Sequence, residues 1–184
     1  RVAQLYIGLK AGTSLDGVDA VLADFDAGRT VILAAVHMAF DADLRGELAA
    51  LTCPGANEID RAGALGNRLA AIYADAALRA LGEGGKTAAA VRAIGCHGQT
   101  VRHRPERGYT VQIGNAALLA ELTGVRVVTD FRSRDIAAGG QGAPLVPAFH
   151  AAVFASRDED RAILNLGGIA NLTWLPRAGA IAGF

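Results

Sequence analysis

The sequence predicts an α/β protein whose mixed sheet begins with an antiparallel meander of three strands. Three β-prone hydrophobic runs lie near the start, at residues 5–9, 18–25 and 30–36, with polar turns between them. From residue 43 onward, segments with helical spacing alternate with further short strands. Of the 184 residues, 52% are hydrophobic, only 5% are aromatic and 23 are glycine. Such a composition is typical of compact α/β packing by small aliphatic side chains.

Two helices are predicted after the meander. Leucines at 44, 48 and 51 share one helical face, and Pro54-Gly55 ends that helix. Apolar residues then recur at intervals of three or four from Ile59 to about Leu81. Asn57 is a suitable N-cap for this long helix, and Gly82 is a suitable stop.

The second half of the pattern alternates strands and helices. Strands are predicted at 91–96, 109–113 and 125–129, and helices follow Asn115 and Pro147. Polar residues come directly after two of these strands, at 97–100 and at 130–135. Because ligands of α/β sheets gather at the carboxyl ends of strands, both polar clusters are candidate site segments.

A polar loop bounded by glycines joins the first two strands. Gly12 and Gly17 allow positive φ and close backbone approach, while Thr13 and Ser14 add hydroxyls to the backbone N–H groups. Converging donors of this kind can replace the water shell of a phosphate. The alternative is a tight hairpin turn without a ligand. The loop lacks the Lys-Ser/Thr ending of a Walker A loop, which excludes a P-loop.

A second hairpin echoes the first. Residues 162–175 again read as strand, glycine turn and returning strand, after a charged break at 157–161. We therefore expect one domain over 1–157 and the beginning of a second over 158–184. A duplicated βββαβαβα unit with one phosphate hairpin from each half resembles the actin-like (ribonuclease H-like) sugar kinases.

Composition narrows the possible partners. Lysine plus arginine and aspartate plus glutamate both number 18, so the chain has no net charge. It therefore lacks the positive charge that would indicate nucleic-acid binding. No apolar run is long enough for a membrane span, and the start lacks the core of a signal peptide. Cys53 and Cys96 have no zinc-site spacing, and we expect a reducing, cytoplasmic compartment. His37, His103 and His150 share no ligand spacing, so they do not predict a metal site.

Six strings of the sequence resemble the anhydro-N-acetylmuramic acid kinases in content and in order, across essentially the whole chain. They are Gly12-Thr13-Ser14-Leu15-Asp16-Gly17-Val18-Asp19, His97-Gly98-Gln99-Thr100-Val101-Arg102-His103, Gln112-Ile113-Gly114-Asn115, Asp130-Phe131-Arg132-Ser133-Arg134-Asp135, the glycine-rich run from Gly139 to Pro147, and Asn165-Leu166-Gly167-Gly168.

The resemblance implies a specific reaction. Water opens the internal 1,6-anhydro bond of a cell-wall amino sugar at the anomeric carbon, and the freed 6-oxygen takes the γ-phosphate of ATP. The product is N-acetylmuramic acid 6-phosphate, an intermediate of peptidoglycan recycling. Such a transfer needs an electrostatic clamp on the phosphates, usually with Mg²⁺, and a carboxylate that activates the water.

The resemblance also assigns site residues. The expected ATP-phosphate contacts are Ala11, Gly12, Thr13, Ser14, Leu15, Asp16, Gly17, Val18, Gly167 and Gly168. Asp16 either orients a hydrated Mg²⁺ or braces the turn. The residues expected around the sugar are His97, Gln99, Thr100, Arg132, Arg134, Asp135 and Gln141. Alternatively, His97 bonds a neighbouring loop, Arg132, Arg134 and Asp135 hold their own loop, and Gly139 to Gly142 form a hinge.

The chain departs from the family pattern in two places. Lys10-Ala11 stand where the family usually has Met-Ser, which removes one hydroxyl donor. The water-activating aspartate of the family belongs to a Gly-Phe-Asp string, whereas Gly183-Phe184 are the last residues here. We therefore assign no catalytic residue within the chain and expect the chain alone to be inactive. Another actin-like sugar or acid kinase, or a non-catalytic ligand-binding or assembly domain, remains an alternative. A homodimer is a separate expectation, because a severed domain should expose an apolar face.

Overall fold

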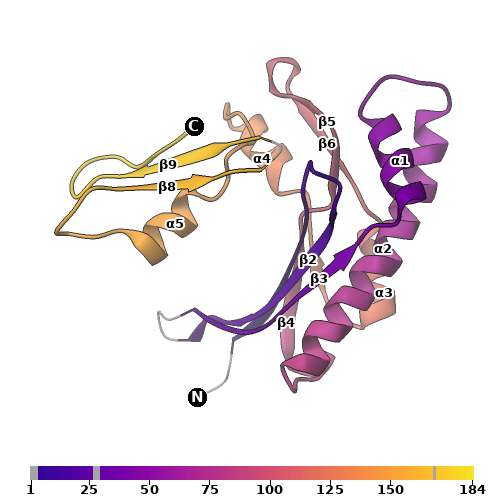
Figure 1. The fold of residues 1–184 in the computed structure, drawn as a ribbon, viewed down its shortest axis with the longest axis horizontal. Coiled ribbons are helices and arrows are strands. Elements are labelled where there is room, and N and C mark those ends of the chain that lie inside the picture. Colours follow the sequence, from indigo (N-terminus) through magenta and orange to yellow (C-terminus); the bar gives the residue numbers. More distant parts are fainter. Residues whose placement is uncertain (1–3, 27–29, 168) are drawn as a thin grey trace. The chain divides into compact units, whose positions relative to one another are not determined.

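The computed structural model describes residues 4–26, 30–167 and 169–184, and within them the predicted meander and mixed sheet are confirmed. β1 (Leu5–Ala11), β2 (Gly17–Asp24) and β3 (Val31–Ala39) pair antiparallel. β4 (Val91–Cys96) pairs parallel with β1, and β7 (Val127–Val128) pairs parallel with β4. The sheet order is β3-β2-β1-β4-β7, the arrangement expected of an actin-like domain. Strands β2, β3 and β4 of this sheet are labelled in Figure 1.

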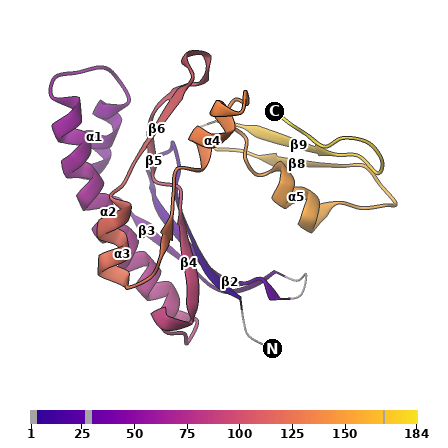
Figure 2. The same cartoon turned by 180° about the vertical axis from the view of Figure 1, so that it is seen from behind.

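Helices cover one face of this sheet. α2 (Glu58–Glu83) packs across β1, β2 and β3, while α1 (Ala42–Leu51) and α3 (Ala116–Thr123) pack beside it (Figure 2). Asp41 caps α1 by accepting from the Leu44 amide at 2.7 Å. Asn115 caps α3 as predicted, accepting from the Leu118 amide at 2.9 Å.

The long helix α2 begins directly after Asn57 as predicted, but the details of both its ends differ. Asn57 adopts φ 53° and its side chain makes no capping hydrogen bond. The helix continues past Gly82 and is capped by Gly84. Gly82 lies open to space on the helix surface, so nothing there forces the chain to turn.

The core lies between α2 and the centre of the sheet. Leu5, Ile7 and Leu9 of β1 are each at most 2% exposed and alternate with less buried residues, as the period of a strand requires. From the helix side, Leu69 and Tyr73 are 0% and 1% exposed. This packing fixes the end of β1 at which the glycine-bounded loop begins.

A two-stranded sheet of β5 (Gln99–Arg104) and β6 (Tyr109–Ile113) lies between β4 and α3 in the sequence. Only β6 is expected from the alternation of apolar residues. Short 3-10 turns occur at Ala88–Ala90 and Pro105–Arg107. Arg102 fastens β5 to the start of α2, since its Nη2 donates to Glu58 Oε2 at 2.7 Å and to Leu51 O at 3.3 Å.

The remaining elements belong to a second compact unit, which comprises 104–110 and 131–184. It contains α4 (Phe131–Ala137), α5 (Pro147–Phe154) and a three-stranded sheet of order β10-β9-β8, formed by Ala182–Gly183, Asn171–Leu175 and Arg161–Asn165. The predicted hairpin over 162–175 is therefore present. The limits of this compact unit do not show where a second copy of the fold begins, so the domain boundary between residues 157 and 158 stays a prediction.

Candidate functional site

The glycine-bounded loop forms the turn between β1 and β2, and only its ends are buried. Ala11 is 2% and Val18 0% exposed, whereas Thr13, Ser14 and Asp16 are exposed. The buried ends pair with each other in the antiparallel register of the two strands. The loop thus presents a polar tip from a rigid base.

The shape of the loop depends on three hydrogen bonds. The Leu15 amide donates to Gly12 O at 3.3 Å, the Ser14 hydroxyl to Asp16 Oδ1 at 2.7 Å, and the Phe40 amide to Asp16 O at 3.0 Å. The Ser14 hydroxyl, together with the amides of Asp16 and Gly17, holds the pKa of the Asp16 carboxyl below its ordinary value. Asp16 is therefore an exposed, ionised carboxylate at neutral pH.

Two backbone amides at the tip are available for a ligand. Among the residues that the structure describes, the N–H groups of Thr13 and Ser14 donate to no protein acceptor. Neighbouring N–H groups in a turn form a concavity suited to anions. The hydroxyl of Thr13 is exposed beside them. The tip can consequently offer several donors to the oxygens of a phosphate.

The two glycines of the loop do not use the positive φ that they allow. Neither adopts positive φ; Leu15 does so instead, at 56°. A Cβ on Gly17 would overlap the Met38 carbonyl and lie 2.8 Å from the His37 ring. Close approach of β3 is therefore the reason for glycine at 17, which is one of the two uses that the sequence allows for these glycines. A leucine in the left-handed region gives no sign of it in sequence.

The segment after β4 lies against this loop. The His97 amide donates to Leu9 O at 2.9 Å, which extends the pairing of β4 with β1. The His97 ring nitrogen Nδ1 lies 2.8 Å from Gly98 O. Gln99 is 0% exposed, and its Nε2 donates to Gly12 O at 3.2 Å. The structure thus brings His97 and Gln99 to the loop; the ligand role predicted for each stays a prediction.

Thr100 faces the neighbouring strand of the hairpin. Its Oγ1 accepts from Gln112 Nε2 at 3.2 Å, and the residue is half-buried. Gly98, two residues earlier, has φ 71°, and a Cβ there would lie 2.8 Å from Ile113 O. The positive φ and the close fit of these strands together explain glycine at 98.

Within the second unit, Arg132 and Asp135 both act on Gly142. Arg132 Nη1 donates to Gly142 O, and Asp135 Oδ2 accepts from the Gly142 amide at 2.7 Å. Burial lowers the pKa of the Arg132 guanidinium. Arg134 and Gln141 are exposed. These two contacts match the alternative in which the segment holds its own loop, while sugar contacts by these four residues remain a prediction.

The second glycine turn lies between β8 and β9. Asn165 and Asn171 are the last paired residues before the turn, and Gly167 is exposed. A Cβ on Gly167 would meet only Ile169 O, at 3.7 Å. Gly168 lies outside the described residues. The phosphate role expected of Gly167 and Gly168 is not tested by this geometry.

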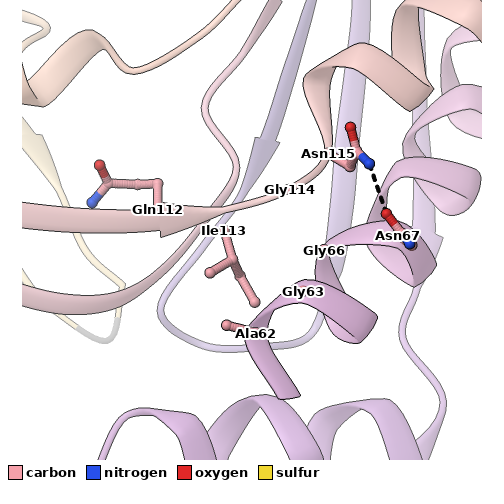
Figure 3. A pocket seen from close by; sticks show the side chains of 8 residues that line it. All are labelled: Ala62, Gly63, Gly66, Asn67, Gln112, Ile113, Gly114 and Asn115. Carbon is pink, nitrogen blue, oxygen red and sulfur yellow. Dashed lines mark hydrogen bonds between the residues drawn. The ribbon is translucent and has the colours of Figure 1, made fainter. Parts of the chain in front are cut away.

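A shallow groove of about 400 Å³ lies between α2 and the turn from β6 to α3 (Figure 3). Gly63 and Gly66 form one side, and Gly114 and Asn115 form the other. Asn115 Nδ2 donates to Asn67 Oδ1 at 2.7 Å across it. Asn115 also caps α3, so its amide already serves the fold. None of the predicted site residues lines this groove.

Over the described ranges 4–26, 30–167 and 169–184, no group of three or more His, Cys, Asp or Glu side chains could hold a metal ion. His37 pairs with Asp19 at 2.8 Å, and His150 Nδ1 lies 2.9 Å from Thr173 Oγ1. Burial raises the pKa of the Cys96 thiol to about 11, which keeps it protonated and unreactive. None of the helices in the described part is long and apolar enough to cross a membrane.

Comparison with known proteins identifies a family. The family model described as anhydro-N-acetylmuramic acid kinase matches residues 4–184. A protein of that name from Nitrosospira multiformis is 58% identical over 184 residues, covering 99% of this chain and 50% of the relative. Proteins of the same name from Variovorax paradoxus and Nitrosomonas europaea are 58% and 54% identical, covering 96% and 97% of this chain. The chain spans about half the length of the curated relatives it matches.

Proposed function

The chain belongs to the anhydro-N-acetylmuramic acid kinase family, and on that premise we propose that it supplies the phosphate-binding, amino-terminal part of an ATP-dependent sugar kinase. The substrate is an anhydro-amino sugar. Water adds to its anomeric carbon, the 1,6-anhydro bond breaks, and the 6-oxygen takes the γ-phosphate of ATP. The products are the 6-phosphate sugar acid and ADP.

The observation that carries this proposal is the tip of the β1–β2 turn. It combines the exposed Thr13 hydroxyl with the N–H groups of Thr13 and Ser14, which donate to no acceptor in the described part of the chain. Donors that are fixed before the ligand arrives stabilise phosphate charge without reorganisation. In this role the loop binds and orients the transferred phosphate.

The donor set also fits Mg²⁺, the usual companion of ATP. Mg²⁺ retains several waters and takes one or two carboxylates together with phosphate oxygens. Asp16 offers one such carboxylate, ionised and exposed, and Ser14 fixes its orientation at 2.7 Å. When bound, the cation would neutralise phosphate charge. Asp16 would hold the cation, either directly or through one of its waters.

The sugar contacts are proposed for residues with free surface near the two candidate segments. His97 and Thr100 are half-buried in the segment that follows β4, and Arg134 and Gln141 are exposed in the second unit. A histidine and a guanidinium suit the hydroxyl and carboxylate groups of a muramic acid. Gly167 and Gly168 are proposed as the second phosphate turn by their resemblance to the family.

A chimera tests the function, because the chain spans only half of its relatives. We would continue the chain with the carboxyl-terminal half of the Nitrosospira multiformis relative and assay transfer from ATP to anhydro-N-acetylmuramic acid. Thr13→Asp puts a negative charge at the loop tip and should lower kcat/KM at least about 100-fold. Thr30→Asp, the same change at an exposed position at the other end of the meander, should have no effect. A folded chimera that phosphorylates no anhydro sugar would refute the proposal.

A further inference from the structure

The side chain of Gln99 contacts the phosphate loop and is shielded from solvent. The side chain is 0% exposed at the start of β5. Its Nε2 lies 3.2 Å from Gly12 O and 3.4 Å from Thr100 O, so both amide hydrogens have acceptors. A bound sugar could reach this amide only if the strand moved.

The oxygen of the same amide indicates why glutamine is present. Gln99 Oε1 is buried and has no hydrogen-bond partner among the described residues. Burying a polar atom without a partner is unfavourable, and an apolar side chain of similar volume would avoid that loss. Packing therefore does not explain glutamine here. What the amide adds is a donor aimed at Gly12 O.

The bond to Gly12 controls which way the next amide points. In a planar trans peptide the carbonyl and the following N–H point in opposite directions. Gln99 and the Leu15 amide together hold the Gly12 carbonyl toward the protein. The N–H of Thr13, which belongs to the same peptide group, is thereby directed outward to the position where a phosphate would bind.

We propose that Gln99 is a positioning residue that orients the phosphate loop through the Gly12 carbonyl, rather than a contact for the sugar. Its effect on phosphate affinity rests on the proposed function. Its effect on the conformation of the loop does not, since the hydrogen bond exists without a ligand. The two effects can therefore be measured separately.

The first test replaces the amide by an apolar chain of similar length in the chimera described above. Gln99→Met removes the donor and the unpartnered oxygen together. We expect KM for ATP to rise about tenfold, the loss of one hydrogen bond, with KM for the sugar and the melting temperature little changed. Gln112→Met is the matched control, because it makes the same change on the same hairpin and removes the donor to Thr100 Oγ1 instead of the donor to Gly12 O.

Amide hydrogen exchange tests the conformation of the loop without requiring enzyme activity. Peptides covering residues 9–16 should exchange faster in Gln99→Met than in the unsubstituted chimera, and at the unsubstituted rate in Gln112→Met. If the chimera is inactive, the proposed function fails while this measurement still decides the role of Gln99. Unchanged exchange of the loop would overturn the positioning role.

The second variant, Gln99→Glu, keeps the shape of the side chain and is measured as a function of pH. In Gln99→Glu the protonated carboxyl can donate to Gly12 O, whereas the carboxylate repels it, and burial favours the protonated form. KM for ATP, taken as a ratio to the unsubstituted chimera at each pH, should therefore rise as pH increases. A flat ratio, or a rise in KM for the sugar alone, would contradict the proposal. If Gln99→Met does not fold, this profile decides.

Discussion

The two glycine turns of the chain look alike in sequence and differ in how they are supported. In the turn between β1 and β2, the Gln99 side chain donates to Gly12 O and the Phe40 amide donates to Asp16 O. The strand β3 also packs closely against Gly17. The described residues of the turn between β8 and β9, 166–167 and 169–170, receive no hydrogen bond from a distant residue. Glycine content alone therefore does not predict how firmly a turn is held, because the supporting contacts come from residues far away in the sequence.

The largest expected difference between the turns comes from adding one methyl group to each. Gly17→Ala should lower the free energy of unfolding by about 3 kcal/mol, because its Cβ would overlap the Met38 carbonyl. Gly167→Ala meets only ordinary contact and should change stability by less than about 0.5 kcal/mol. Urea unfolding of both variants measures this contrast. Equal losses would show that the second turn is as tightly supported as the first.

The next comparison concerns polar support in the second unit. Asp135→Ala leaves the buried Gly142 amide without its acceptor and should cost about 1 to 3 kcal/mol. Exchange of the 139–142 segment should quicken in parallel. Gln141→Ala, an exposed neighbour in the same loop, is the control and should have little effect. A neutral Asp135→Ala would mean that this carboxylate does not hold the loop.

Leucines at the two turns provide a smaller contrast. Leu15 packs partly against the core, whereas Leu166 is 75% exposed. Leu15→Ala should cost about 1 kcal/mol and Leu166→Ala less than about 0.5 kcal/mol, both measured on the 184-residue chain. A larger loss at Leu166 would indicate that its exposed side chain is covered in solution.

The smallest expected effect is electrostatic and local. Ser14→Ala removes the main hydrogen bond that lowers the pKa of Asp16, so this pKa should rise toward its ordinary value. A carboxyl whose pKa is lowered in the folded state stabilises the fold above its unfolded pKa, and that contribution is lost as pH falls through the folded pKa. The variant should therefore lose less stability on acidification. Carbon-13 titration of the Asp16 carboxyl checks the shift, and an unmoved pKa would contradict the assignment.

The sequence predicts the frame well because hydrophobic spacing determines it. The three strands of the meander, the long helix after Asn57 and the cap at Asn115 all follow from local pattern. α4 was missed because Phe131–Ala137 is only two turns long and buries a single side chain, Ile136. A single buried residue cannot produce the repeating apolar spacing by which a helix is predicted from sequence.

The supports of the site could not be predicted in the same way. The contact of Gln99 with Gly12 joins residues 87 positions apart, and no local pattern marks a buried amide. The positive φ of Leu15 and the hydrogen bond from the Gly142 amide to Asp135 also depend on tertiary surroundings. The candidate residues can be named from resemblance, but which of them support their own loops depends on tertiary contacts that the sequence does not reveal.

The long separation between Gly12 and Gln99 also has a consequence for biosynthesis. The loop emerges from the ribosome early, whereas its support arrives only after α1, α2 and β4 have been translated. Contacts that are this distant in sequence form slowly, since a large loop must close first. A nascent chain that stops before β5 would carry all the residues of the loop without the contact that aims its amides.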